Sequence, residues 1–117
     1  MTKQQIIEYC LAKEGAYLDF PFAGEDYAVV KVKKTEGGKS RIFAEVFTLN
    51  GADMLTFSTD ENTALFLREN FPDIIIKGWH CPPVQAKYKS SVAIDLIQDE
   101  QLLQFLDTSY QRALSKL

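Results

Sequence analysis

The apolar residues of this chain recur at helical spacing near both ends and alternate with polar residues over much of the middle. Helical spacing predicts three helices, each preceded by a residue type that caps helix N-termini. They are expected over residues 2–14, over residues 59–70 and from Asp99 onward, with Gly15 as a stop for the first. The first two also carry capping boxes, formed by Thr2 with Gln5 and by Ser58 with Glu61.

Alternation between the first two helices predicts three strands, Tyr27–Lys33, Arg41–Leu49 and Asp53–Ser58. Gly37-Gly38 and Asn50-Gly51 separate them, and Asn-Gly is a strong signal for a tight hairpin. We therefore expect an antiparallel meander. Its first strand should place one set of side chains in the core and a basic set on the opposite face. The first set is Val30 and Val32, and the second is Tyr27, Val29, Lys31 and Lys33.

Two further strands are expected after the second helix, at Ile74–His80 and Tyr88–Ile97, separated by Pro82-Pro83. The aromatic segment 17–24 is interpreted as an extended connector packed on the domain. The predicted order is α-βββ-α-ββ-α. It indicates a single two-layer α+β domain over residues 1–117, with a five-stranded, mostly antiparallel sheet and helices on one face.

Charge is sorted along the chain, although the net charge is only −3. Residues 31–41 hold five basic residues and one acid, and residues 74–94 hold three basic residues and no acid. Such a distribution favours one face that meets an anion, by phosphate contacts if the partner is nucleic acid. Lysines on a hairpin also protect sheet edges from aggregation, so both interpretations stay open. The candidate nucleic-acid-binding residues are Lys31, Lys33, Lys34, Lys39, Arg41, Lys77, Lys87 and Lys89.

Composition places the chain among globular proteins, since 46% of its residues are hydrophobic and 25% are charged. No apolar run approaches the roughly 20 residues that span a bilayer, so no membrane association is expected. Cys10 and Cys81 lie far apart without a CxxC spacing, and the N-terminus has no apolar leader. These features predict a reduced, cytoplasmic protein.

The residues that could carry chemistry crowd around Trp79, His80 and Cys81. Neighbours in an extended segment point to opposite faces, so His80 is poorly placed to activate Cys81, and no catalytic residue is assigned. Two cysteines and one histidine cannot complete a structural zinc site. No Gly-rich phosphate loop is present, so no nucleotide cofactor is predicted. Trp79 is either a packing residue or a platform for stacking a base.

Several short motifs together resemble the YjbR/MmcQ-like family over essentially the whole chain. These are Phe20-Pro21-Phe22, Val30-Lys31-Val32, Phe43-Ala44, the segment 67–72, Gly78-Trp79-His80 and Ser109-Tyr110. The resemblance implies a secretion-chaperone-like or frataxin-like α+β fold. It also implies DNA binding, with β-hairpin wings as the proposed contact surface.

This sequence differs from the family pattern at three places. Ser58 stands where members often carry a lysine, and Tyr88-Lys89 stands where they often show His-Trp. Pro82 to Gln85 resembles a local enlargement of a loop. The leading hypothesis is a non-enzymatic domain that binds DNA weakly, without sequence preference, through its basic hairpin. The competing hypothesis is a protein-interaction or chaperone-like module that binds a polypeptide or itself.

Overall fold

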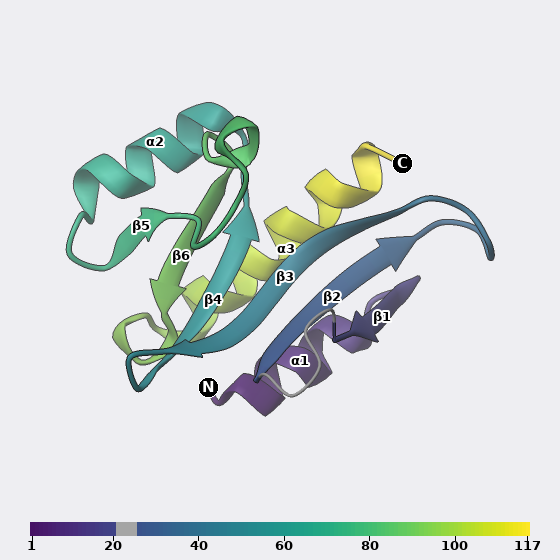
Figure 1. Cartoon of the computed structure of the whole chain (residues 1–117), viewed down its shortest axis with the longest axis horizontal. Coiled ribbons are helices and arrows are strands. Elements are labelled where there is room, and N and C mark those ends of the chain that lie inside the picture. The colour runs from purple at the N-terminus through teal and green to yellow at the C-terminus, as the bar shows by residue number, and fades with distance from the viewer. Residues whose placement is uncertain (21–25) are drawn as a thin grey trace.

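The fold is a six-stranded antiparallel sheet with helices packed against it, described by a computed structural model over residues 1–20 and 26–117 (Figure 1). The strands follow the spatial order β1-β2-β3-β4-β6-β5. Their bounds are β1 Ala16–Asp19, β2 Tyr27–Lys33, β3 Ser40–Leu49, β4 Ala52–Ser58, β5 Ile75–Lys77 and β6 Lys89–Ala93. The helices are α1 Lys3–Leu11, α2 Glu61–Asn70 and α3 Asp99–Ser115, with short 3-10 turns η1 Pro83–Gln85 and η2 Ile94–Leu96.

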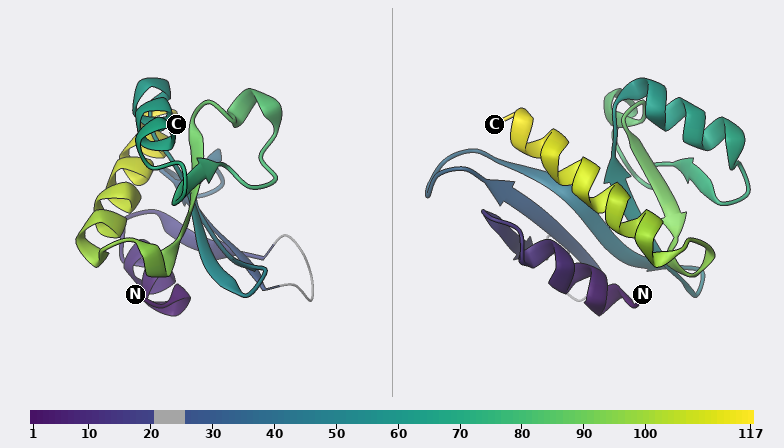
Figure 2. Two further views of the ribbon diagram at one scale, coloured as in Figure 1. Left: turned by 90° about the vertical axis from the view of Figure 1, so that its left-hand side faces the viewer. Right: turned by 180° about the vertical axis from the view of Figure 1, so that it is seen from behind.

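The main core lies between the sheet and helices α1 and α3, which cover the same face (Figure 2). α1 contributes Ile6 and Cys10, both fully buried, and α3 stacks Phe105 on Phe57 of β4 with ring centroids 4.3 Å apart. α2 joins this core through Leu67. The segment between β5 and β6 lies on the other side of the sheet (Figure 2). The predicted two-layer α+β class is confirmed.

Local signals set the helix ends and the tight turns. Thr2 caps α1 with a complete capping box, as predicted, whereas α2 is capped by Asp60 rather than by Ser58. Asp99 is the first residue of α3 and not its cap. Asn50 and Gly51 both have positive φ, 51° and 82°, which is the conformation that a two-residue hairpin turn requires.

The predicted count of five strands is wrong, because residues within the expected connector form β1. Ala16–Asp19 pairs antiparallel with β2, from Ala16 opposite Val32 to Asp19 opposite Val29. Four residues are too few for a periodic signal, and this strand exists only because β2 offers a free edge. Residues 21–24 of the connector, and with them Pro21 and Phe22 of the Phe20-Pro21-Phe22 motif, lie outside the described residues.

Two details of the later strands also differ from prediction. The strand expected over Tyr88–Ile97 ends at Ala93, and the 3-10 turn η2 follows it over Ile94–Leu96. On β2, Val29 is buried, although it lies on the face that was expected to be basic. The sheet therefore carries apolar packing on both faces near its centre. None of the described helices combines the length and the apolar character that crossing a membrane requires.

Candidate anion-binding groove

A fork opens in the sheet where β3 and β4 separate. Their pairing ends at Glu45 opposite Thr56, and beyond this point β3 pairs with β2 while β4 pairs with β6. Ser109 of α3 fills the angle between them. Its hydroxyl accepts a hydrogen bond from the Ser58 N–H at 2.9 Å and donates one to the Phe43 carbonyl at 2.5 Å. One buried side chain thus satisfies a backbone donor and a backbone acceptor that have lost their sheet partners.

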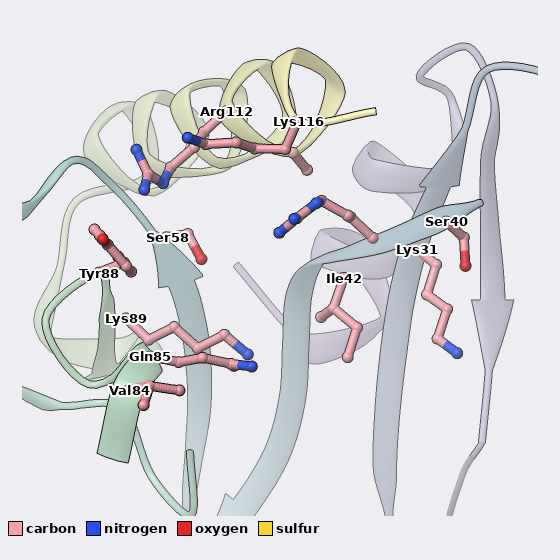
Figure 3. A pocket seen from close by; sticks show the side chains of 12 residues that line it. Lys31, Ser40, Ile42, Ser58, Val84, Gln85, Tyr88, Lys89, Arg112 and Lys116 are labelled. Atoms are coloured by element: carbon pink, nitrogen blue, oxygen red, sulfur yellow. The ribbon is translucent and has the colours of Figure 1, made fainter. Parts of the chain in front are cut away.

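The fork leaves a groove of about 560 Å³, which we call the fork groove (Figure 3). α3 forms one wall, β2 and β3 a second, and β4, β6 and the segment before β6 a third (Figure 3). Ser58 and Lys89, which lie opposite each other on β4 and β6, both line it. The lining residues are Lys31, Ser40, Arg41, Ile42, Ser58, Val84, Gln85, Tyr88, Lys89, Arg112, Ala113 and Lys116.

Five of the lining residues are basic, and none is acidic. Two of the five have acidic partners just outside the lining. Lys31 pairs with Asp19 at 2.9 Å, and this hydrogen bond and charge hold the pKa of Asp19 below its usual range. Lys89 pairs with Glu45 at 3.3 Å. Within the described part of the chain, the other three form no ion pair; they are Arg41, Arg112 and Lys116.

Arg112 is positioned by an aromatic ring. Its guanidinium carbon lies 4.5 Å from the centroid of the Tyr88 ring, and the Lys87 ammonium lies 5.4 Å from the same centroid. A cation over the face of a tyrosine is attracted by the ring quadrupole. Tyr88 therefore holds a cation from α3 beside those of the sheet.

Lys89 belongs to a cluster of three polar side chains on the sheet face opposite α1 and α3. The two oxygens of Glu45 are used separately: one accepts from the Tyr27 hydroxyl at 2.8 Å and the other from Lys89 at 3.3 Å. The side chains of Lys89 and Glu45 are each only 13% exposed, so this pair is shielded from solvent screening. Burial, and then the charge and hydrogen bond of Glu45, raise the pKa of the Tyr27 hydroxyl.

Three of the eight candidate residues named from the sequence meet in the fork groove, namely Lys31, Arg41 and Lys89. The remaining five do not line it. On the hairpin between β2 and β3, Lys33 pairs with Glu36 at 3.0 Å, and Lys34 donates to the main-chain oxygen of Leu117 at 3.3 Å. The other three are Lys39 beside the hairpin turn, Lys77 on the edge strand β5 and Lys87 next to Tyr88.

Arg112 and Lys116, which lie at the end of the last helix, were not singled out from the sequence. Their spacing of four residues was a usable signal, since residues four apart lie on one face of a helix. Ala113 lines the groove between them. What the spacing could not indicate is which part of the sheet this helical face meets.

The residues around Trp79 pack against β6 and against one another. The Trp79 N–H donates to the Ser91 hydroxyl at 2.9 Å, and its ring meets the His80 ring edge-on with centroids 4.6 Å apart. Cys81 is partly buried, and Cys10 is buried in the core, which raises the pKa of its thiol to about 12. No three histidine, cysteine or acidic side chains among the described residues are grouped to hold a metal ion.

Comparison with known proteins places the chain in a family. A family model described as YjbR matches residues 11–112. The fold is similar to the crystal structure of a Deinococcus radiodurans protein with a DUF419 domain, with TM-score 0.79 and 25% identity over 93% of this chain and 75% of that one. It is also similar to a Pseudomonas syringae protein solved by structural genomics, with TM-score 0.76 and 18% identity over 97% of this chain and 99% of that one.

No curated protein matches the chain. At 18% identity the likeness to the Pseudomonas syringae protein shows the fold alone. The family match, in contrast, spans most of the sequence and confirms the resemblance found from the short motifs. The chain therefore belongs to the YjbR family.

Proposed function

We propose that this protein is a non-enzymatic binding domain that contacts nucleic acid through phosphate groups, with the fork groove as its principal contact. The basic hairpin, residues 31–41, extends this surface through Lys33, Lys34 and Lys39. Neutralising phosphates releases counterions, and this supplies affinity without sequence preference. Lys77 on β5 is not part of the proposed surface.

The observation that carries this proposal is the convergence of five basic side chains on one groove without an acidic lining residue. One comes from β2, one from β3 and one from β6. The other two are Arg112 in the last turn of α3 and Lys116 just after it. Cations scattered for solubility would be interspersed with acids, as they are elsewhere on this acidic chain. The convergence therefore favours an anionic ligand over general solvation.

Fluorescence anisotropy with short labelled duplex and single-stranded DNA tests the proposal. The affinity should fall steeply as salt rises from about 50 to 200 mM, with a slope of about −0.9 per phosphate contacted on a duplex. Arg41→Glu combined with Lys116→Glu should lower the affinity and flatten this slope. Both side chains are exposed, so the fold should survive.

Lys77→Glu is the matched control for Arg41→Glu alone, because each replaces one cation by one anion at an exposed position, and Lys77 lies on the far edge of the sheet. It should reduce binding much less than Arg41→Glu. Equal losses for the two variants would assign binding to overall charge and not to the groove. Undetectable binding at low salt would overturn the proposal.

A second candidate function, binding of a polypeptide or self-association, is favoured by a different surface. Helix α2 exposes Leu65 and Phe66, at 52% and 59%, and Phe71 at its end is 46% exposed. Neighbouring exposed apolar side chains of this size often mark interaction surfaces. If this function is correct, sedimentation should show self-association, or light scattering should show protection of an unfolded test protein. Phe66→Ser should remove either effect without changing DNA affinity.

A further inference from the structure

The positive charge of the fork groove exceeds what its neighbouring carboxylates balance. Asp19 and Glu45 pair with Lys31 and Lys89, respectively. Arg41 and Lys116 form no ion pair with a described residue, and Arg112 forms none either, although its charge helps to hold the pKa of Asp60 below its usual value. The groove therefore keeps a net positive charge. A phosphodiester carries one negative charge, whereas a phosphate monoester carries about −1.5 to −2 near neutral pH.

The arrangement of these cations also matters. Lys89, Arg112 and Lys116 approach one volume from different elements, whereas the Lys31 ammonium points away from it toward Asp19 of β1 (Figure 3). A nucleic-acid backbone presents its charges in a row, and basic side chains that track it are spread along a groove or face. Cations grouped around one volume suit a compact group with more than one charge. The volume of about 560 Å³ falls within the range of roughly 300–1,000 Å³ that is typical of small-ligand sites.

We infer that the fork groove is a binding site for a phosphate monoester, carried either by a free nucleotide or by the 5′-phosphorylated end of a nucleic-acid strand. This inference rests on the proposed function, because it names the ligand class of the same groove. It goes beyond that function by giving a terminal phosphate a preference over the phosphodiesters of the backbone. No Gly-rich loop is needed, since side chains supply the positive charge.

Two of the cations are already positioned before a ligand arrives. The shielded Glu45 pair holds Lys89, and the Tyr88 ring holds Arg112. Fixed side chains lose less conformational entropy when a ligand binds, which raises affinity without added contacts. Arginine also presents paired N–H donors whose geometry matches two phosphate oxygens.

The rest of the lining suits the remainder of a nucleotide. The side chains of Ser58 and Gln85 make no hydrogen bond to any described residue, so their polar groups are available to sugar hydroxyls and base edges. Val84 is 73% exposed and adds an apolar surface at the same segment. The groove therefore places a charged region, suited to the phosphate, beside neutral polar and apolar groups, suited to the sugar and the base.

The test compares oligonucleotides of identical sequence with a 5′-phosphate and with a 5′-hydroxyl, using fluorescence anisotropy. Isothermal titration with a nucleoside 5′-monophosphate, the matching nucleoside and inorganic phosphate distinguishes the two sources of the monoester. The 5′-phosphate should raise oligonucleotide affinity at least about tenfold, the effect of one or more charged hydrogen bonds. The monophosphate should compete with the phosphorylated strand, and the nucleoside should not.

Arg41→Ala should lose most of this preference, and because Arg41 is exposed its replacement should leave the fold intact. Lys77→Ala, which lies outside the groove, should retain it. Equal affinity for the two oligonucleotides together with no binding of the monophosphate would overturn the inference and leave the proposed function standing. Binding of the monophosphate without salt-dependent DNA binding would support the site and overturn the proposed function.

Discussion

The Arg112 guanidinium lies 4.5 Å from the centre of the Tyr88 ring, so a cation near the end of α3 is held by the residue just before β6. No hydrogen bond of the Tyr88 hydroxyl joins it to another described residue, which leaves the ring itself as the contact. Arg112 held in this position lines the fork groove together with the basic residues of the sheet.

Replacing this ring should weaken phosphate binding without removing a charge. Tyr88→Ala should lower the affinity for a phosphorylated probe about two- to fivefold, which corresponds to a cation–π contribution of about 0.5–1 kcal/mol. Tyr88→Phe keeps the ring and should bind nearly as well as the parent protein. Anisotropy of the three proteins at one salt concentration measures this. Equal losses for both variants would mean that the hydroxyl contacts the ligand and that the ring does not act through Arg112.

Ser109→Ala should destabilise the fold, because it leaves the Ser58 N–H and the Phe43 carbonyl without their partner in a buried place. An unsatisfied buried backbone group costs about 1–3 kcal/mol, so urea unfolding should show a loss of at least that size. Ser115→Ala is the control. Its hydroxyl donates to the Arg112 carbonyl on the exposed side of the same helix, and the loss should stay within about 0.5 kcal/mol.

Gly15→Ala and Gly51→Ala should separate the cost of a left-handed backbone from the cost of a steric clash. Both glycines have positive φ, 78° and 82°. A Cβ on Gly51 would meet no atom within 4 Å, whereas one on Gly15 would lie 2.2 Å from the Lys33 carbonyl oxygen. Gly51→Ala should therefore cost about 1–2 kcal/mol of unfolding free energy, and Gly15→Ala clearly more. Similar losses in urea unfolding would show that the chain at Gly15 can move away from β2.

Asp60 should make stability depend on pH in the acid range. The backbone N–H and the hydroxyl of Thr63 each donate to its carboxylate at 2.8 Å, and these hydrogen bonds hold its pKa below the usual value. A lowered folded-state pKa gives stability that is present above the unfolded pKa of about 3.9. That stability is lost as pH falls through the folded-state pKa.

Asp60→Asn keeps an oxygen that can accept the Thr63 N–H but does not titrate. Its unfolding free energy should therefore fall less steeply below about pH 4 than that of the parent protein. Urea unfolding at several pH values between about 2 and 5 measures both slopes. Parallel slopes would show that the cap does not contribute to acid unfolding.

The sequence alone determined the elements whose signals are local. A capping box at Thr2 begins α1, and the Asn50-Gly51 turn joins β3 to β4, because each depends on a few neighbouring residues. These signals were enough to predict the two-layer α+β class and, with the short motifs, the family.

Only the tertiary structure decided the sixth strand and the groove. β1 is too short to carry a pattern, and it forms because β2 presents an unpaired edge. The groove exists because β3 and β4 separate beyond Glu45, and because α3 crosses at that point with Ser109 in the angle. Arg41 and Arg112 meet there although they lie far apart in the sequence, and no local rule brings together side chains whose meeting depends on strand divergence and helix placement.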